Sequence, residues 1–188
     1  YKNKKNEYKL YDSSNHFSCV GYANRIILKS LNYKKHINKK ISSSNCFYPS
    51  IKKTNEYDKL IKKLGGIDLF LLASGSSDGH VAFNNSDSKL NSTTHIIKLK
   101  KTTRTDNLKT FKTFKILKNV PKYGITVGLG TIYKLSKKAV LVLAGKEKNL
   151  AAKIILKSKS YNKQWPASII YKCKKNHIYI DNAAIKKI

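Results

Sequence analysis

Short, nearly continuous apolar runs alternate along this chain with segments that have the periodicity of amphipathic helices. The runs are Ile67–Ala73, Tyr123–Val127 and Ala139–Ala144. Runs of this length and composition are typical of strands that are buried on both faces of a parallel sheet. Helical patterns lie around them, as in Thr54–Leu64 and Lys146–Lys157. The alternation predicts an α/β fold in which helices cover both sides of a mostly parallel sheet.

The remaining patterns agree with the same architecture. Apolar residues recur at three- and four-residue steps over Asn15–Leu31, which predicts a helix capped by Ser13 or Asn15. A short helix is predicted over Thr131–Lys137 and one more strand over His177–Asp181. Neither an internal repeat nor a domain linker is evident. We therefore expect a single domain over residues 1–188, built as a three-layer Rossmann-like sandwich.

The net charge of +29 would ordinarily suggest a protein that binds nucleic acid. Only Arg25 and Arg104 are arginines among the 39 basic residues, and the lysines are spread along the whole chain. Proteins that read phosphate and guanine specifically favour arginine for its planar fork. Specific nucleic-acid binding is therefore not expected, whereas electrostatic attraction of small anionic substrates is.

The three cysteines, Cys19, Cys46 and Cys173, include no CxxC pair. This pattern describes neither a disulfide framework nor a zinc site, and it favours a reducing compartment. The apolar runs are too short to span a bilayer, and no secretion signal is recognisable. We expect a cytoplasmic protein without a membrane partner. The chain begins with Tyr1 and contains no Met, which predicts either a fragment or a sequence from which some residues are missing.

Ligands of open parallel sheets bind beyond the carboxyl ends of the strands. The segment after the first run, Ser74–Asn84, contains Gly75 and Gly79, which allow a backbone to turn sharply and to approach a ligand closely. Asp78 and His80 lie two residues apart, and a carboxylate beside an imidazole fixes its tautomer and raises its basicity. An isolated Asp-Gly-His sequence would more often be a polar turn. Its position after a buried strand favours an acid–base site.

Two more segments follow the other predicted strands. Gly128 and Gly130 precede a predicted helix, where backbone N–H groups commonly bind anions. A tight turn between strand and helix explains these glycines equally well. Lys148 follows Gly145 and lies where it would pair with a phosphate, although position alone says little in a chain so rich in lysine.

Taken together and in this order, the three segments resemble the glucosamine-6-phosphate deaminase family. The resemblance is carried by Asp78–Asn84, by Val120–Thr131, and by Ala139–Gly145 followed by Lys148. It covers Ile67–Asp181 well and the earlier part of the chain loosely. The related 6-phosphogluconolactonases have a similar turn, but the residues that follow the histidine favour the deaminases.

The resemblance implies an enzyme that binds an amino-sugar phosphate, opens its ring, moves a proton between C1 and C2 and releases ammonia. It implies that His80 assists ring opening, that Asp78 orients His80, and that Lys148 holds the phosphate. It implies a phosphorylated sugar as the partner, no cofactor and no metal, and it leaves a homo-oligomer open. The backbone expected to hold the substrate includes Gly75, Gly79, Gly128 and Gly130.

Several family positions carry different residues in this chain. A carboxylate of the family's catalytic group is replaced by Asn85, which cannot ionise. An arginine that grips phosphate is replaced by Lys109, which keeps the charge and loses the bidentate fork. The nearest counterpart of the proton-abstracting aspartate lies in Asn6–Tyr8, and Ser92–Ile97 lacks the basic residues of the family's allosteric site. The family's N-terminal strands and phosphate loop have no counterpart, which predicts an N-terminally truncated version of the fold.

The loss of a general base costs roughly 10²–10⁴-fold in rate. The sequence therefore leaves three hypotheses. The first is a divergent sugar-phosphate isomerase or deaminase in which Asp78, His80 and position 85 form the catalytic group. The second is a degenerate relative that binds sugar phosphates without turnover. The third is a basic protein that binds nucleic acid through its surface charge.

Overall fold

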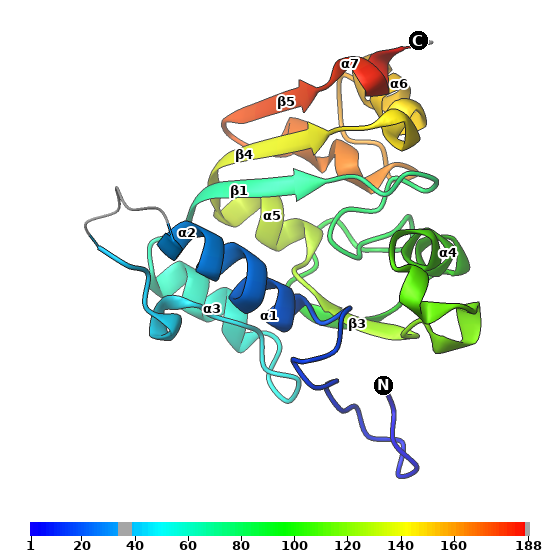
Figure 1. Ribbon diagram of the computed structural model, residues 1–188. Helices are drawn as coiled ribbons and strands as arrows, with labels where there is room; N and C mark the ends of the chain where they lie inside the picture. The colour runs from blue at the N-terminus through cyan, green and yellow to red at the C-terminus, as the bar shows by residue number, and fades with distance from the viewer. Residues whose placement is uncertain (34–38, 187–188) are drawn as a thin grey trace.

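A three-stranded parallel sheet is the main feature of the computed structural model, which describes residues 1–33 and 39–186 (Figure 1). Its strands are β1 (Ile67–Ala73), β4 (Ser136–Leu143) and β5 (Asn176–Ile180), in the order β1-β4-β5. Leu71 of β1 lies opposite Val140 of β4 in the parallel register. The prediction of an α/β fold with a parallel sheet is confirmed, and β1 has the predicted bounds.

The helices follow the predicted pattern in part. Helix α1 begins at Cys19 rather than at Asn15, because the side chain of Ser18 accepts a hydrogen bond from the backbone N–H of Gly21 and caps the helix there. The segment predicted as Lys146–Lys157 is divided into a 3₁₀ turn and a helix. The α-helices are α1 (Cys19–Tyr22), α2 (Lys29–Tyr33), α3 (Glu56–Lys63), α4 (Lys101–Thr110), α5 (Leu129–Leu135), α6 (Asn149–Lys157) and α7 (Asn182–Ile185).

The other helical segments are short. A π-helix, η1 (Ala23–Leu28), joins α1 to α2. The 3₁₀ segments are η2 (Ser43–Asn45), η3 (Lys112–Phe114), η4 (Leu117–Asn119), η5 (Lys146–Lys148) and η6 (Pro166–Lys172). No helix among residues 1–33 and 39–186 is both long enough and apolar enough to cross a membrane.

One face of the sheet carries the hydrophobic core. Leu72 of β1 and Leu141 and Leu143 of β4 point to this face and are buried. They pack with apolar side chains of α5, α6 and η6, so both helices that follow or precede β4 cover the same side. The core residues contributed by these three helical segments include Leu129, Ile132, Ala151, Ala152, Ile155, Ile169 and Ile170.

Much of the opposite face of the sheet is exposed within the described part of the chain, although Val140 on this face is buried. Leu71 is 67% exposed and Tyr179 is 60% exposed, and Leu69 and Val142 lie on the same open face. Within the described residues, the helices that cover this sheet lie on one side of it. The reason is topological. The chain steps from β1 to β4 to β5 in one direction, and right-handed connections then place both covering helices on one side.

A second, smaller sheet lies between β1 and β4 in the sequence. Its strands are β2 (His95–Lys98) and β3 (Tyr123–Thr126), which pair antiparallel. The prediction that the apolar run Tyr123–Val127 forms a central strand of the parallel sheet is wrong. An apolar run does not specify which strand it pairs with. The sequence of β2 has no pattern from which a strand would be predicted. Thr126 at the end of β3 accepts a hydrogen bond from the backbone N–H of Phe83 and thereby supports the loop after β1.

A buried carboxylate connects three elements of the fold. Asp58 of α3 is only 5% exposed. One of its oxygens accepts a hydrogen bond from the backbone N–H of Thr94, at 2.8 Å, and the other accepts one from the hydroxyl of Thr131 in α5. Carboxylates are rarely buried without such partners. Asp58 therefore fixes α3 against α5 and against the start of β2.

Replacing Asp58 with alanine is expected to lower the free energy of unfolding by about 2–4 kcal/mol. The substitution leaves the N–H of Thr94 and the hydroxyl of Thr131 buried without a partner, and each orphaned group costs about 1–3 kcal/mol. Urea denaturation followed by circular dichroism measures the loss. Asp68→Ala is the matched control, because Asp68 forms only an exposed ion pair with Lys137. Equal losses in the two variants would contradict a structural role for Asp58.

Candidate active site

The loop after β1 folds back on itself and places a histidine beside the end of the strand. The backbone N–H of Gly75 donates to the carbonyl of His80 at 2.7 Å, and Ser74 forms an isolated bridge with Val81. Asn84 is fully buried and donates to the carbonyls of Val81 and Val127. Hydrogen bonds within the loop therefore fix its first part, and the hydrogen bond from Asn84 to Val127 fixes its last part against the end of β3.

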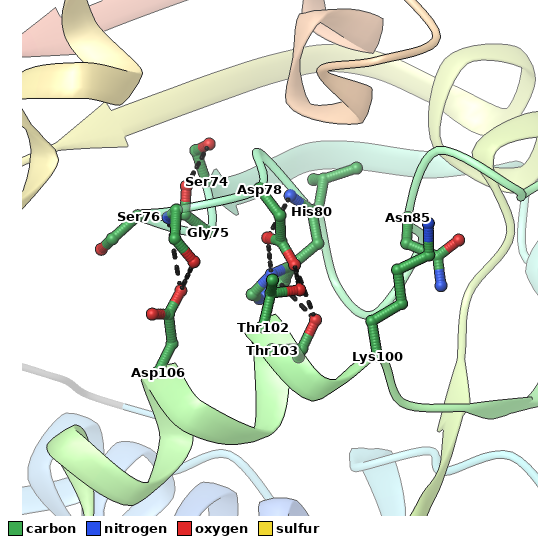
Figure 2. A network of polar contacts seen from close by, with 12 residues as sticks. Ser74, Gly75, Ser76, Asp78, His80, Asn85, Lys100, Thr102, Thr103 and Asp106 are labelled. Carbon is green, nitrogen blue, oxygen red and sulfur yellow. Dashed lines mark hydrogen bonds and ion pairs between the residues drawn. The ribbon is translucent and has the colours of Figure 1, made fainter.

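Asp78 and His80 form a close pair within this loop (Figure 2). The Nδ1 atom of His80 lies 2.6 Å from Oδ1 of Asp78, and both side chains are about 15% exposed. With Nδ1 donating to the carboxylate, Nε2 is the ring atom that exchanges protons. No group among the described residues hydrogen-bonds Nε2. The prediction that the carboxylate contacts and orients the imidazole is consistent with this geometry.

Helix α4 holds the other side of the Asp78 carboxylate. The hydroxyl groups of Thr102 and Thr103 both donate to Oδ2 of Asp78, at 2.5 and 3.0 Å. Burial alone would raise the pKa of Asp78. The hydrogen bonds from His80 and Thr102 and the charge of the imidazole outweigh that effect and hold the pKa well below its usual range. Asp78 therefore remains ionised at neutral pH and acts on His80 as a fixed negative charge.

Two glycines make room for this pair. A Cβ atom on Gly75 would lie 2.2 Å from Nδ1 of His80 and 2.6 Å from Oδ1 of Asp78. Gly79 has a φ of +62°, and a Cβ atom there would lie 2.2 Å from the ring of Trp165. Both positions therefore require glycine, Gly75 for space and Gly79 for space and conformation.

An open cleft of about 850 Å³ lies beyond the carboxyl end of β1. His80, Lys148, Lys109 and Gly75 all line it, although they come from three separate parts of the sequence. Parallel strands bring their carboxyl ends to one edge of a sheet, which is why residues after β1 and β4 meet here. Figure 1 shows that α4, which carries Lys109, lies beyond the same end of β1.

Lys148 is fixed in this cleft by the loop after β1. Its ammonium group donates to the carbonyl of Ser74 at 2.7 Å and to the hydroxyl of Ser76 at 3.0 Å. An ammonium has three N–H donors, so one remains for an anion. Lys109 lies on the opposite wall and is exposed. The cleft therefore contains two ammonium groups together with the carboxylates of Asp106 and Glu147.

The structure leaves other predicted site residues outside the cleft. Asn85 lies apart from His80 in Figure 2, and its side-chain oxygen accepts a hydrogen bond from the backbone N–H of Asp87. Gly128 and Gly130 pack against the backbone around Ser92, and the N–H of Gly130 donates to the carbonyl of Ser92. The N–H of Gly130 therefore serves the turn into α5, the alternative that the sequence left open. Asn6 lies in an exposed N-terminal turn and does not line the cleft either.

Asp106 also lines the cleft, although no pattern in the sequence indicates it. It lines the cleft from α4, and its carboxylate accepts hydrogen bonds from Ser77. Asp78, His80 and Asp106 form the one described group of three metal-ligating residue types, with atoms within 4.8 Å of one another. Protein donors already contact three of the four carboxylate oxygens of this group, which makes it a poor fit to an open cation site.

Curated proteins that are similar to this chain include glucosamine-6-phosphate deaminases. The chain is 35% identical to a glucosamine-6-phosphate deaminase of Mycoplasma mycoides over 79% of this chain and 59% of the relative. It is 38% identical to that of Bacillus pumilus over 68% of this chain and 51% of the relative. The chain is a homologue of the glucosamine-6-phosphate deaminases. No protein-family model matches it.

Solved structures agree with this homology. A monomeric glucosamine-6-phosphate deaminase of the NagB superfamily superposes with a TM-score of 0.75 at 28% identity, over 95% of this chain and 70% of that one. The structure of a devB protein gives a TM-score of 0.66 at 14% identity, a likeness that concerns the fold alone. The prediction of a Rossmann-like α/β fold related to the deaminases is confirmed.

The chain spans a little over half the length of the deaminases that it matches. It spans 59% of the Mycoplasma mycoides protein and 51% of the Bacillus pumilus protein.

Proposed function

We propose that this protein binds a phosphorylated amino sugar in the cleft beyond β1 and catalyses ring opening followed by proton transfer between C1 and C2. The observation that carries the proposal is the convergence of the Asp78–His80 pair with the ammonium groups of Lys148 and Lys109 in one cleft. Acid–base and anion-binding groups of this kind are what a sugar-phosphate isomerase or deaminase requires. The reaction of the intact protein is taken to be that of its relatives, the release of ammonia from glucosamine-6-phosphate.

Each group has a role that follows from its position. His80, fixed through Nδ1 by an ionised carboxylate, uses Nε2 to move protons to and from the ring oxygen of the sugar. Lys148, fixed by Ser74 and Ser76, donates its remaining N–H to the phosphate. Gly75 leaves the space in which the Asp78–His80 pair forms. No step assigned to these residues uses a cofactor.

The proposal is tested by adding glucosamine-6-phosphate to the purified chain and measuring the ammonia and fructose-6-phosphate that are released. Release of both products at a rate proportional to the protein concentration is the expected result. Binding without release would favour the second hypothesis, a protein that binds sugar phosphates without turnover. The amide of Asn85, which cannot ionise, supports this second hypothesis. A chain that neither binds nor converts the compound would refute both.

Replacing Lys148 with alanine is expected to weaken binding of glucosamine-6-phosphate by roughly ten- to a hundredfold, because a charge-assisted hydrogen bond contributes about 1.5–3 kcal/mol. Isothermal titration calorimetry measures the dissociation constant. Lys153→Ala is the matched control, because Lys153 lies on the exposed side of the neighbouring helix α6. Its substitution removes the same charge from the chain. Equal weakening in the two variants would mean that the overall charge, rather than Lys148, attracts the phosphate.

A further inference from the structure

The proposed proton transfer needs a carboxylate that faces the cleft and has an oxygen free to take a proton. The two positions to which the resemblance assigns such carboxylates do not provide one. Position 85 is an asparagine and lies outside the cleft, and Asn6 lies in an exposed turn. An amide cannot accept a proton from carbon under these conditions. Among the described residues, the base for this reaction has to come from another element.

Asp78 is a poor candidate, although it contacts His80. Its two oxygens accept hydrogen bonds from the imidazole, from the backbone N–H of His80 and from the hydroxyls of Thr102 and Thr103. These donors hold its pKa well below the usual range, which makes the carboxylate a weak base. It also does not line the cleft. Its position suits orientation of the histidine.

Two carboxylates do line the cleft, Asp106 and Glu147. Glu147 is exposed, and its carboxylate lies over the backbone at Gly145, beside the turn that leads into α6. Asp106 is half-buried on α4, and one of its oxygens lies within 4.8 Å of a ring nitrogen of His80. Asp106 is therefore the cleft carboxylate that stands next to the proposed acid–base histidine.

The hydrogen bonds of Asp106 leave one oxygen available. Both the backbone N–H and the hydroxyl of Ser77 donate to Oδ2, the hydroxyl at 2.8 Å. No donor among the described residues contacts Oδ1. Figure 2 shows Asp106 reaching from α4 to the loop that carries Asp78 and His80. Ser77 thus fixes the carboxylate through one oxygen and leaves the other free.

We propose that Asp106 is the catalytic carboxylate that takes the proton from C2 of the opened sugar and returns it to C1. This inference rests on the proposed function. In the first step the C2–H bond breaks, the proton moves to Oδ1 of Asp106, and the electron pair forms the C1=C2 double bond. The former C1=O pair binds a proton that the His80 imidazolium donates. The result is an enol that still carries the ammonium group on C2.

The second step reverses the flow of protons. Asp106 returns its proton to C1, and the ammonium group gives one N–H proton to His80 as the C2=N bond forms. Water then hydrolyses this iminium group to a ketone and an ammonium ion. Asp106 and His80 end in the states in which they began, so the cycle needs no oxidant, reductant or further reactant.

The inference is tested with the variant Asp106→Asn and glucosamine-6-phosphate in deuterated water. Proton NMR follows the exchange of the C2 hydrogen and the deuterium that enters C1 of the product. The variant is expected to lower the rate of exchange at least about 100-fold, the loss typical of a missing general base. The dissociation constant from calorimetry is expected to change less than about threefold. Asp106→Glu, which keeps a carboxylate, is expected to recover part of the exchange.

The controls separate this inference from the proposed function. Asp68→Asn removes the same charge from an exposed ion pair with Lys137. This variant is expected to exchange the C2 hydrogen of the substrate at the wild-type rate. A wild-type chain that shows no exchange at all would refute the proposed function. An active wild type with an equally active Asp106→Asn variant would refute only the role of Asp106. The role of Asp106 would also be refuted if EDTA abolished the exchange and a divalent cation restored it, because Asp106 would then act through a metal.

Discussion

Replacing His80 with alanine is expected to lower the turnover of glucosamine-6-phosphate by roughly 10²–10⁴-fold, the range typical of a lost general acid–base group. The upper end is expected, because in the proposed reaction the imidazole serves both ring opening and the later proton transfers. The Nδ1 atom of His80 contacts Asp78, and its Nε2 atom has no hydrogen-bond partner among the described residues, so Nε2 is available for these roles. Coupled assay of released ammonia measures the loss.

The control for this variant is His177→Ala. His177 is an exposed histidine of β5 and is remote from the lining of the cleft. It is expected to retain the wild-type rate. Circular dichroism of His80→Ala should match that of the wild type, because the hydrogen bonds of the histidine ring among the described residues are those with Asp78 and Thr103. Turnover in His80→Ala within about threefold of the wild-type rate would remove the imidazole from the reaction.

Replacing Gly79 with alanine is expected to destabilise the protein by about 2–5 kcal/mol. Two costs combine. A left-handed backbone conformation costs a residue with a Cβ atom about 1–2 kcal/mol, and φ at Gly79 is +62°. The added carbon would also lie 2.2 Å from the ring of the buried Trp165, so the ring must move, and overpacking of this kind costs about 1–3 kcal/mol. Denaturation by urea measures the sum.

Gly65→Ala separates the two costs. Gly65 also has a positive φ, +85°, but a Cβ atom there would meet nothing within 4 Å. Its substitution therefore carries the conformational cost alone and is expected to lose about 1–2 kcal/mol. Losses of equal size at the two positions would show that the contact between Gly79 and Trp165 imposes no strain.

The parts of the site that follow β1 could be predicted from the sequence. A continuous apolar run defined β1 from Ile67 to Ala73, and ligand groups lie after such strands for a general topological reason. Two glycines and an Asp-Gly-His sequence then indicated the pair that the structure contains. These inferences needed only local patterns and one rule of sheet architecture. They did not need the relative positions of distant segments.

Helix α4 shows what the sequence could not predict. Only Thr103 of this helix is buried, so it has no apolar stripe with helical periodicity. It is held instead through polar contacts, including those of Thr102 and Thr103 with Asp78. Asp106 belongs to this helix, and without the helix its carboxylate was one of ten acidic residues with nothing to distinguish it. The antiparallel partner of β3, strand β2, could not be predicted either. Strand pairing depends on contacts between residues that are distant in the sequence, which local patterns do not report.

The contact between Trp165 and the turn at Gly79 has a practical consequence. Trp165 is the sole tryptophan of the chain, and the carbonyl of Gly79 accepts a hydrogen bond from Ala167, two residues further on. All indole emission therefore originates beside the turn that joins Asp78 to His80. Any ligand that shifts this turn will change the fluorescence of the unlabelled protein, and the signal comes from that one place.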